Sequence, residues 1–524
     1  MTDNLTENKN VRASVSDQLL TSAPPSNTPA RASGLFSRAA IGLFGLSFFE
    51  RTAFFTLKYL LILIFVDQMG MGAEYGAIVL GAAITTQYLL YSVSGVLSDR
   101  FLGLRATLAL GVLLIAPAYL ALAVALDNTE TATDGSFIKT VLFFTLAMQL
   151  CAVGLVRLSG FNLVKQTLSE DDPRSEKLYV LYYWVESIGA LMASICAGTF
   201  VQRFGWTPVF GTLVIGMMGS AAMVHFNRHQ LLMPSASVTH KNRIAIAAVS
   251  SVLLITGAFF LLSTPAAAGI AILAVAVGVV VYIYRNKESF RAPKQREFLF
   301  AFSIVTIASL LFNALQEQQW SSLVLFADRA VDRTAFGITL HPSHFQSIVP
   351  VMLVLLGPVI ATLLDKRQFD SASTRLSGLL RKLSVAFGLM TMCFVVLFAS
   401  TFFTGADQKI HFTWLTIALV LAGPAELFIY PIAFNAITSN VPTKLAGTMS
   451  GIHFTCYAGA GFASGALASL AGGVPSEQGL EAVVLNYREF LGLVSSIGVV
   501  FVLICIGASL LFAAGKFSNR LNET

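Results

Sequence analysis

Long, nearly uncharged apolar segments recur along the whole chain and restrict the folds open to it. A helix of about 20 apolar residues is long enough to cross the hydrocarbon core of a bilayer. Because lipid offers the backbone no hydrogen-bond partners, segments of this length form helical bundles. The sequence therefore predicts an all-α membrane protein with about fourteen transmembrane helices. They lie near residues 36–66, 74–97, 106–126, 138–168, 178–201, 206–226, 244–263, 266–284, 297–327, 344–364, 383–404, 412–438, 445–472 and 487–515.

The composition agrees with a membrane protein and excludes other classes. Of 524 residues, 12% are charged and 55% hydrophobic, whereas a soluble chain carries about 25% charged residues. The net charge of +6 is not gathered in a basic patch, and surplus Lys and Arg in membrane proteins belong to cytoplasmic loops, so no nucleic-acid partner is predicted. The five cysteines lie inside apolar runs without paired or metal-ligand spacing, which indicates packing residues.

The distribution of Lys and Arg predicts the orientation. With the N-terminus inside, the cytoplasmic loops and tails hold 24 of these residues and the opposite side holds six. This bias favours both termini in the cytoplasm and an even number of crossings. Residues 1–34 are polar, rich in Ser, Thr, Asn and Pro, and lack the apolar core of a signal peptide. We expect a disordered cytoplasmic tail there.

The spans divide into two sets of six. Segments 244–263 and 266–284 consist almost wholly of Ala, Val, Ile, Leu and Gly, with a Thr-Pro step between them. We interpret them as an inserted two-helix hairpin. The expected divisions are a tail at 1–34, an N-terminal six-helix bundle at 35–226, a linker with the hairpin at 227–296, a C-terminal six-helix bundle at 297–515 and a tail at 516–524.

Charged residues inside the first span form one stripe. In "SFFERTAFFTLKY", residues 47–59, the side chains of Glu50, Arg51 and Lys58 share a helix face about 16 Å long with Ser47 and the Phe54–Phe55 pair. A charge at the bilayer centre costs about 2.5–3.5 kcal/mol, so such residues are functional candidates. Glu50 and Arg51 alternatively form a purely structural pair. Lys58 has no acidic neighbour within a turn and requires an anionic partner elsewhere.

Other intramembrane charges lie in both halves of the chain. The fourth span carries Arg157 and Lys165, and Lys165 alternatively extends to the cytoplasmic interface. The C-terminal half carries Glu317 within "EQQWSS", and Glu426 between Pro residues in "GPAELFIYP". Proline and glycine beside an intramembrane carboxylate indicate a helix that bends. Pairing of N-terminal cations with C-terminal carboxylates across a central cavity follows as the simplest arrangement.

An aromatic cluster marks the fifth span. Its stretch "YYWVESIG" brings Tyr183 beside Glu186 and Ser187, and forms either ordinary core packing or the wall of a cavity for an organic ligand. His341 and His344 lie at a loop edge without further ligands, so no metal is predicted. No catalytic triad order or phosphate-binding loop occurs. We therefore expect neither an enzyme nor a cofactor.

Taken in order, these segments resemble the proton-dependent oligopeptide transporter family of the major facilitator superfamily. "SFFERTAFFTLKY" is similar to the family's first-helix pattern Glu-x-x-Glu-Arg-x-x-Tyr-Tyr followed by a basic residue. The resemblance continues with "GVLSDRFLG" after Tyr88, "SGFNLVKQ" with Lys165, "YYWVESIG", "EQQWSS", "FQSIVP" and "GPAELFIYP".

The resemblance implies a proton-coupled symporter that imports di- and tripeptides or peptide-like compounds by alternating access. It implies a monomer without cofactor in a lipid bilayer, and the hairpin suggests a prokaryotic inner membrane. The residues expected to bind substrate are Lys58, Tyr88, Lys165, Phe54, Phe55, Tyr183, Glu186, Ser187 and Trp320. Those expected in proton coupling and gating are Glu50, Arg51, Glu317 and Glu426.

This chain also departs from the family pattern. Ser47 replaces one first-helix carboxylate, and Phe54 and Phe55 replace tyrosines and cannot donate hydrogen bonds. Ser187 and Val349 stand where amides are usual, while Glu186 adds a carboxylate. A modified or cationic peptide-like substrate therefore stays open. So do two other functions, an exporter or exchanger of another amphiphilic solute such as a drug or peptide antibiotic, and a non-transporting receptor on the same fold.

Overall fold

A computed structural model describes most of the chain. The described residues are 36–129, 135–167, 175–231, 240–335, 337–364, 372–405, 408–438, 446–472 and 479–513. The predicted tails, 1–34 and 516–524, lie outside them.

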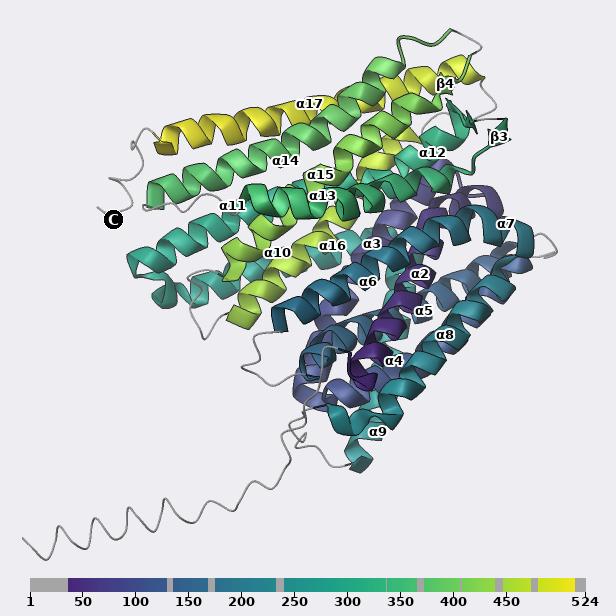
Figure 1. The fold of residues 1–524 in the computed structure, drawn as a ribbon, viewed down its shortest axis with the longest axis vertical. Coiled ribbons are helices and arrows are strands. Elements are labelled where there is room, and N and C mark those ends of the chain that lie inside the picture. The colour runs from purple at the N-terminus through teal and green to yellow at the C-terminus, as the bar shows by residue number, and fades with distance from the viewer. Residues whose placement is uncertain are drawn as a thin grey trace, which may run out of the picture.

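Helices make up nearly all of the described structure (Figure 1). The α-helices are α2 (Arg38–Leu63), α3 (Ala73–Leu97), α4 (Leu104–Asp127), α5 (Gly135–Lys165), α6 (Ser175–Ile195), α7 (Val201–Phe204), α8 (Trp206–Phe226), α9 (His240–Ser263), α10 (Pro265–Arg285), α11 (Pro293–Gln316), α12 (Ser322–Arg329), α13 (Ile348–Leu364), α14 (Ala372–Ser400), α15 (Phe412–Thr438), α16 (Ala446–Ala471) and α17 (Leu480–Ala513). Short turns are η1 (Ile64–Gln68), η2 (Ser98–Leu102), η3 (Cys196–Phe200), η4 (Arg228–Gln230), η5 (Lys287–Phe290), η6 (Glu317–Trp320) and η7 (Pro342–Ser347).

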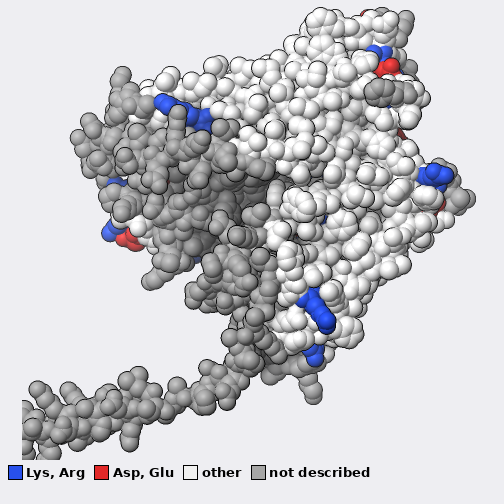
Figure 2. Space-filling view, in the orientation of Figure 1, with Lys and Arg blue, Asp and Glu red and all other residues white. Residues whose placement is uncertain are grey.

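The number of membrane-crossing helices agrees with the sequence. Among the described residues, 12 helical segments are long and apolar enough to span a bilayer. Two further helices bring the number to fourteen: α2, which carries Glu50, Arg51 and Lys58, and the shorter α13. Figure 2 shows a face with almost no charged side chains, and the described Lys, Arg, Asp and Glu residues on it lie toward its edges. That pattern fits a protein surrounded by lipid.

Tight turns with left-handed glycines join successive spans. Gly103 and Gly205 both have φ of 80° and end one helical segment where the next begins. Side chains with a Cβ rarely adopt this conformation, so glycine permits the abrupt reversal. Asp127, at the end of α4, accepts hydrogen bonds from the backbone N–H groups of Trp206 (2.7 Å) and Thr207 (2.8 Å) and so caps the start of α8.

The buried apolar side chains form two large cores, one in each half of the chain. The first joins α2 to α8 and the inner side of α9, and the second joins α11 to α17. In Figure 1 the helices of the first half, purple to blue, lie beside the green and yellow helices of the second half. The two helices of the hairpin have different neighbours. Helix α9 packs on α3 and α5 of the first half, whereas α10 contacts α3 of the first half and α16 of the second.

The seam between the halves is tightest along α3 and α16, which run antiparallel. It extends from Gly472 beside Ala73, through Gly465 beside Gly81, to the rings of Tyr457 and Tyr88 at 5.5 Å. A Cβ atom added at Gly81 would lie 2.7 Å from Gly465 Cα. Glycines thus let the two backbones touch. Because α3 begins and α16 ends here, this seam closes the end of the molecule that carries loop 64–72.

Glycine 81 offers a test of this packing. We expect Gly81→Leu to destabilise the protein by about 1–3 kcal/mol, the usual effect of overpacking, because backbone atoms cannot move aside as a flexible side chain can. Gly219→Leu on α8 is the matched control, since nothing lies within 4 Å of its added Cβ. Thermal unfolding in detergent measures both. Equal unfolding temperatures for the two variants would contradict the close seam.

Four two-residue strands, outside the spans, are a detail that the all-α prediction missed. Strand β1 (Val331–Asp332) pairs in parallel with β4 (Ile410–His411), and β2 (Thr334–Ala335) pairs antiparallel with β3 (Ile338–Thr339). They lie in the connections after α12 and before α15. The extended backbone there satisfies its hydrogen bonds within a local hairpin, β2–β3, and between two loops, β1–β4.

Candidate functional site

The charged stripe of α2 faces protein along its whole length. Glu50 and Arg51 are buried, with side chains only 2% exposed, while Lys58 is 13% exposed. Phe54 and Phe55, on the same helix, are half-buried, and their ring centroids lie 5.3 Å apart. This face is therefore shielded from lipid, as the cost of intramembrane charge requires.

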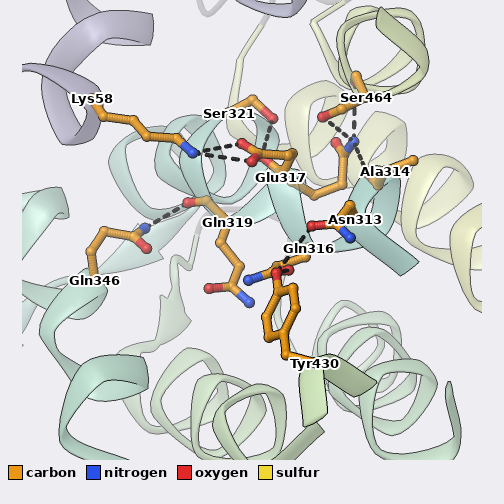
Figure 3. A network of polar contacts seen from close by, with 11 residues as sticks. Lys58, Asn313, Ala314, Gln316, Glu317, Gln319, Ser321, Gln346, Tyr430 and Ser464 are labelled. Atoms are coloured by element: carbon orange, nitrogen blue, oxygen red, sulfur yellow. Dashed lines mark hydrogen bonds and ion pairs between the residues drawn. The ribbon is translucent and has the colours of Figure 1, made fainter. Parts of the chain in front are cut away.

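Lys58 finds its anionic partner in the other half of the molecule. Its Nζ atom lies 2.9 Å from Oε2 and 3.1 Å from Oε1 of Glu317 (Figure 3). The indole ring of Trp320 lies beneath the same ammonium group, with its centroid 5.1 Å from Nζ. The pairing between an N-terminal cation and a C-terminal carboxylate, which the charge pattern predicts, is present here.

Glu317 is presented by a break in the seventh span. The α-helix α11 ends at Gln316, the turn η6 follows as a 3-10 helix, and α12 resumes at Ser322. Polar side chains hold this break in place. Gln318 donates to Ser464 on α16 (3.1 Å), and the carbonyl of Gln319 accepts from Gln346 (2.7 Å), as Figure 3 shows. One backbone carbonyl of the break is thereby satisfied by Gln346, and the Gln318 side chain ties the break to α16.

A second charge cluster lies one to two turns away on α2. Arg51 Nε lies 3.0 Å from Glu50 Oε2 and 3.6 Å from Oε1 of Glu186 on α6. The hydroxyl of Ser47 donates to Glu186 Oε1 at 3.2 Å. On the other side, Arg157 Nη2 of α5 lies 3.9 Å from Glu186 Oε2. Helices α2, α5 and α6 thus meet around two carboxylates and two guanidinium groups.

Arg157 is a residue to which the sequence assigned no role. Its side chain is 35% exposed, and its guanidinium lies over the ring of Tyr91 at 5.5 Å. Lys165, predicted to bind substrate, is the last residue of α5, and its side chain lies outside the described residues. The two are eight positions apart, about 12 Å along a helix. Position along the span could have singled out Arg157 in the sequence. Arg157 lies well inside the apolar run, whereas Lys165 lies at its end.

Glu426 occupies the C-terminal side of the same region. Its carboxylate is buried, and Oε1 has no hydrogen-bond partner among the described residues. It lies beside Gln316 and within electrostatic reach of Lys58 and Glu317. The phenol of Tyr430, one turn further on α15, donates to Gln316 Oε1 (2.6 Å) and Asn313 Oδ1 (3.0 Å). Two carboxylates, Glu317 and Glu426, therefore share one nearby lysine.

Aromatic side chains pack beside these charges. Trp320 stacks on Tyr59 at 5.1 Å and lies 6.1 Å from Phe55. Tyr183 is 59% exposed and lies within electrostatic reach of Glu186, Arg157 and Glu426, so it faces both halves.

Two further predicted residues make contacts of other kinds. Tyr88 packs in the α3–α16 seam against Tyr91 and Tyr457. The Ser187 hydroxyl donates to the carbonyl of Tyr183 in its own helix.

In the part of the chain that the structure describes, no group of three or more His, Cys, Asp and Glu side chains is placed to hold a metal ion. The arrangement instead offers paired positive and negative groups beside aromatic rings. Such a site can bind an organic solute with charged ends and can change its pairing when a carboxylate gains a proton.

Solved structures share this fold. The chain matches a tetrameric crystal structure of PepTSo2 with a TM-score of 0.75 at 18% identity, covering 92% of this chain and 99% of that one. It matches a crystal structure of a peptide transporter POT in complex with alafosfalin with a TM-score of 0.73 at 21% identity, covering 91% and 96%. The chain therefore shares the fold of these two structures.

Sequence comparison then gives the family. The POT family pattern matches residues 105–482. The chain is 24% identical to the dipeptide and tripeptide permease A of Cronobacter turicensis over 475 residues, 90% of this chain and 92% of that protein. It is also 24% identical to that of Klebsiella pneumoniae over 437 residues, 83% and 84% of the two chains. The chain belongs to the POT family, which is a family of transporters and not of enzymes.

Proposed function

We propose that this protein is a proton-coupled symporter that imports di- and tripeptides or peptide-like compounds. POT transporters are proton-coupled peptide symporters, and the bacterial relatives are named dipeptide and tripeptide permeases. The observation that carries the proposal for this chain is the Lys58–Glu317 ion pair, which joins the two halves inside the membrane. An ion pair between two halves that move relative to each other can couple protonation of its carboxylate to opening of the transporter.

The proposed mechanism follows from competition for charge. A proton on Glu317 removes the negative charge that holds Lys58, and a substrate carboxylate near Lys58 offers that cation a different partner. Either event weakens the link between the halves. Glu426 provides a second carboxylate that is able to hold a proton in the same space, with Glu50 and Arg51 as the charge pair that ties α2 to α6 through Glu186.

The closed seam indicates which conformational state the structure represents. With both termini in the cytoplasm, as the Lys and Arg bias favours, the end closed by α3 and α16 faces outward. The structure then corresponds to a state that is closed toward the outside. We propose that a single chain is the transporting unit in the inner membrane of a prokaryote.

Substrate binding on α5 gives a paired test. We expect Arg157→Gln to reduce gradient-driven dipeptide uptake to background, because it removes the partly exposed cation at the cavity. The same change at Lys165 tests the role that the sequence resemblance assigns to it. Loss of uptake in folded Lys165→Gln would confirm that role, and normal uptake would remove Lys165 from the site. Normal uptake by Arg157→Gln would contradict the placement of Arg157.

Uptake by proteoliposomes tests the function itself. Purified protein in liposomes, with the outside more acidic than the lumen, should accumulate a radiolabelled dipeptide above its external concentration. Accumulation should stop when a protonophore dissipates the gradient. Dipeptide binding without any translocation would favour a receptor, and export of a drug or peptide antibiotic instead of dipeptide uptake would favour the exporter.

A further inference from the structure

Glu186 places an additional negative charge beside the most exposed guanidinium of the charge cluster. The Arg51–Glu50 pair is internal, since both side chains are 2% exposed and the charged atoms are 3.0 Å apart. Arg157 is the more accessible guanidinium of the cluster at 35% exposed, and Glu186 Oε2 lies 3.9 Å from it. Glu186 thus occupies the position from which another carboxylate would approach Arg157.

The contacts of Glu186 hold it there. Ser47 donates to Oε1 at 3.2 Å from one side and Arg51 Nε lies 3.6 Å from the same oxygen. The side chain is 11% exposed, so the charge is fixed within the protein and is not free to move into solvent. Without Glu186 the four-residue cluster would carry one net positive charge, and with it the cluster is neutral.

The second cation of the site, Lys58, is also paired with a carboxylate. Lys58 lies 2.9 Å from Glu317, and Glu426 lies nearby without an ion pair to any described residue. The described charges around the site therefore comprise three cations, Arg51, Lys58 and Arg157, and four carboxylates, Glu50, Glu186, Glu317 and Glu426. Each of these three cations has a carboxylate partner inside the protein.

We propose that Glu186 sets the charge selectivity of the site, so that it favours peptide-like cations with a neutral C-terminus over zwitterionic peptides. This inference rests on the proposed function and names its substrate class. A zwitterionic dipeptide places its carboxylate on Lys58 in competition with Glu317, or on Arg157 in competition with Glu186. A dipeptide amide carries the same amine but no carboxylate, so it does not compete with Glu186 for Arg157.

Two ligands of nearly equal size isolate this effect. Binding of Ala-Ala and of Ala-Ala-amide to purified full-length protein is measured by isothermal titration calorimetry at one pH and salt concentration. We expect wild-type protein to bind the amide about tenfold more tightly, a factor that corresponds to roughly 1.4 kcal/mol. Glu186→Gln keeps the shape of the side chain and removes its charge, and we expect the preference to invert in favour of Ala-Ala.

The controls separate charge at this position from charge in general. Glu288→Gln removes a carboxylate from an exposed Arg–Glu pair at the surface and should keep the wild-type ratio. Ser47→Ala removes one hydrogen bond to Glu186 without changing charge, and it should shift the ratio toward Ala-Ala by a smaller factor. If Glu186→Gln fails to fold, the wild-type ratio and Ser47→Ala decide the question.

The possible failures are distinct. Tighter binding of Ala-Ala than of its amide by wild-type protein would overturn the selectivity and leave the proposed function in place. An unchanged ratio in folded Glu186→Gln would do the same. Binding of neither ligand to wild-type protein would overturn the proposed function and this inference together.

Discussion

Lys58→Ala is expected to abolish gradient-driven dipeptide uptake and to lower the free energy of unfolding by about 3–5 kcal/mol, the usual result of removing one partner of a buried ion pair. The change removes the described cation nearest to Glu317, at 2.9 Å, and the same lysine lies within electrostatic reach of Glu426. Two carboxylates would then lie close together without it. Uptake in proteoliposomes and thermal unfolding in detergent measure the two effects.

Charge-preserving and paired variants show whether the ion pair is the cause. Lys58→Arg keeps the positive charge and should retain more uptake than Lys58→Ala. The double variant Lys58→Gln with Glu317→Gln leaves no unpaired charge in the pair, so it should be more stable than either single change while remaining inactive. A double variant whose loss of stability equals the sum of the two single losses would show that the pair contributes nothing.

Glu426→Gln is expected to eliminate accumulation driven by a pH gradient while leaving exchange of labelled for unlabelled dipeptide across the membrane. Glutamine preserves the size and polarity of the side chain but cannot take up a proton. Because Glu426 is buried beside Gln316 and near Glu317, a change in its charge alters the pairing of Lys58. Loss of coupled uptake to background is the predicted magnitude.

The control for this change is an exposed carboxylate. Glu74→Gln, at the start of α3, should leave both uptake and exchange at the wild-type level. Gradient-driven accumulation that persists in folded Glu426→Gln would exclude this residue from proton coupling. Loss of both uptake and exchange would assign Glu426 to substrate binding or to opening of the site instead.

The positions of the spans follow from the sequence because burial in lipid is a local requirement. Each run of apolar residues of sufficient length becomes a helix, since every backbone group must be satisfied within its own segment. The break at η6 was not predicted, because Glu317–Trp320 has no proline or glycine to mark it. Its stabilising contacts come from Ser464 and Gln346, which are remote in the chain.

The charged pairs depend on tertiary structure and could be predicted only partly from the sequence. The sequence indicates that Lys58 needs a carboxylate and that Glu317 is a candidate, yet the two lie 259 positions apart. Nothing local selects Glu317 over Glu426. Helical periodicity groups Ser47 with Glu50 and Arg51, but it carries no information about Glu186 on α6, which Ser47 and Arg51 contact. The orientation of Arg157 depended equally on the packing of α5.

The most direct measurement of the central claim is proton movement that accompanies the substrate. Liposomes containing the purified protein and a lumenal pH-sensitive dye are prepared without a pH gradient, with the membrane potential clamped by potassium and valinomycin. Addition of a transported dipeptide outside should acidify the lumen, and Glu426→Gln should not respond. Dipeptide entry with no change in lumenal pH in wild-type protein would contradict proton-coupled symport.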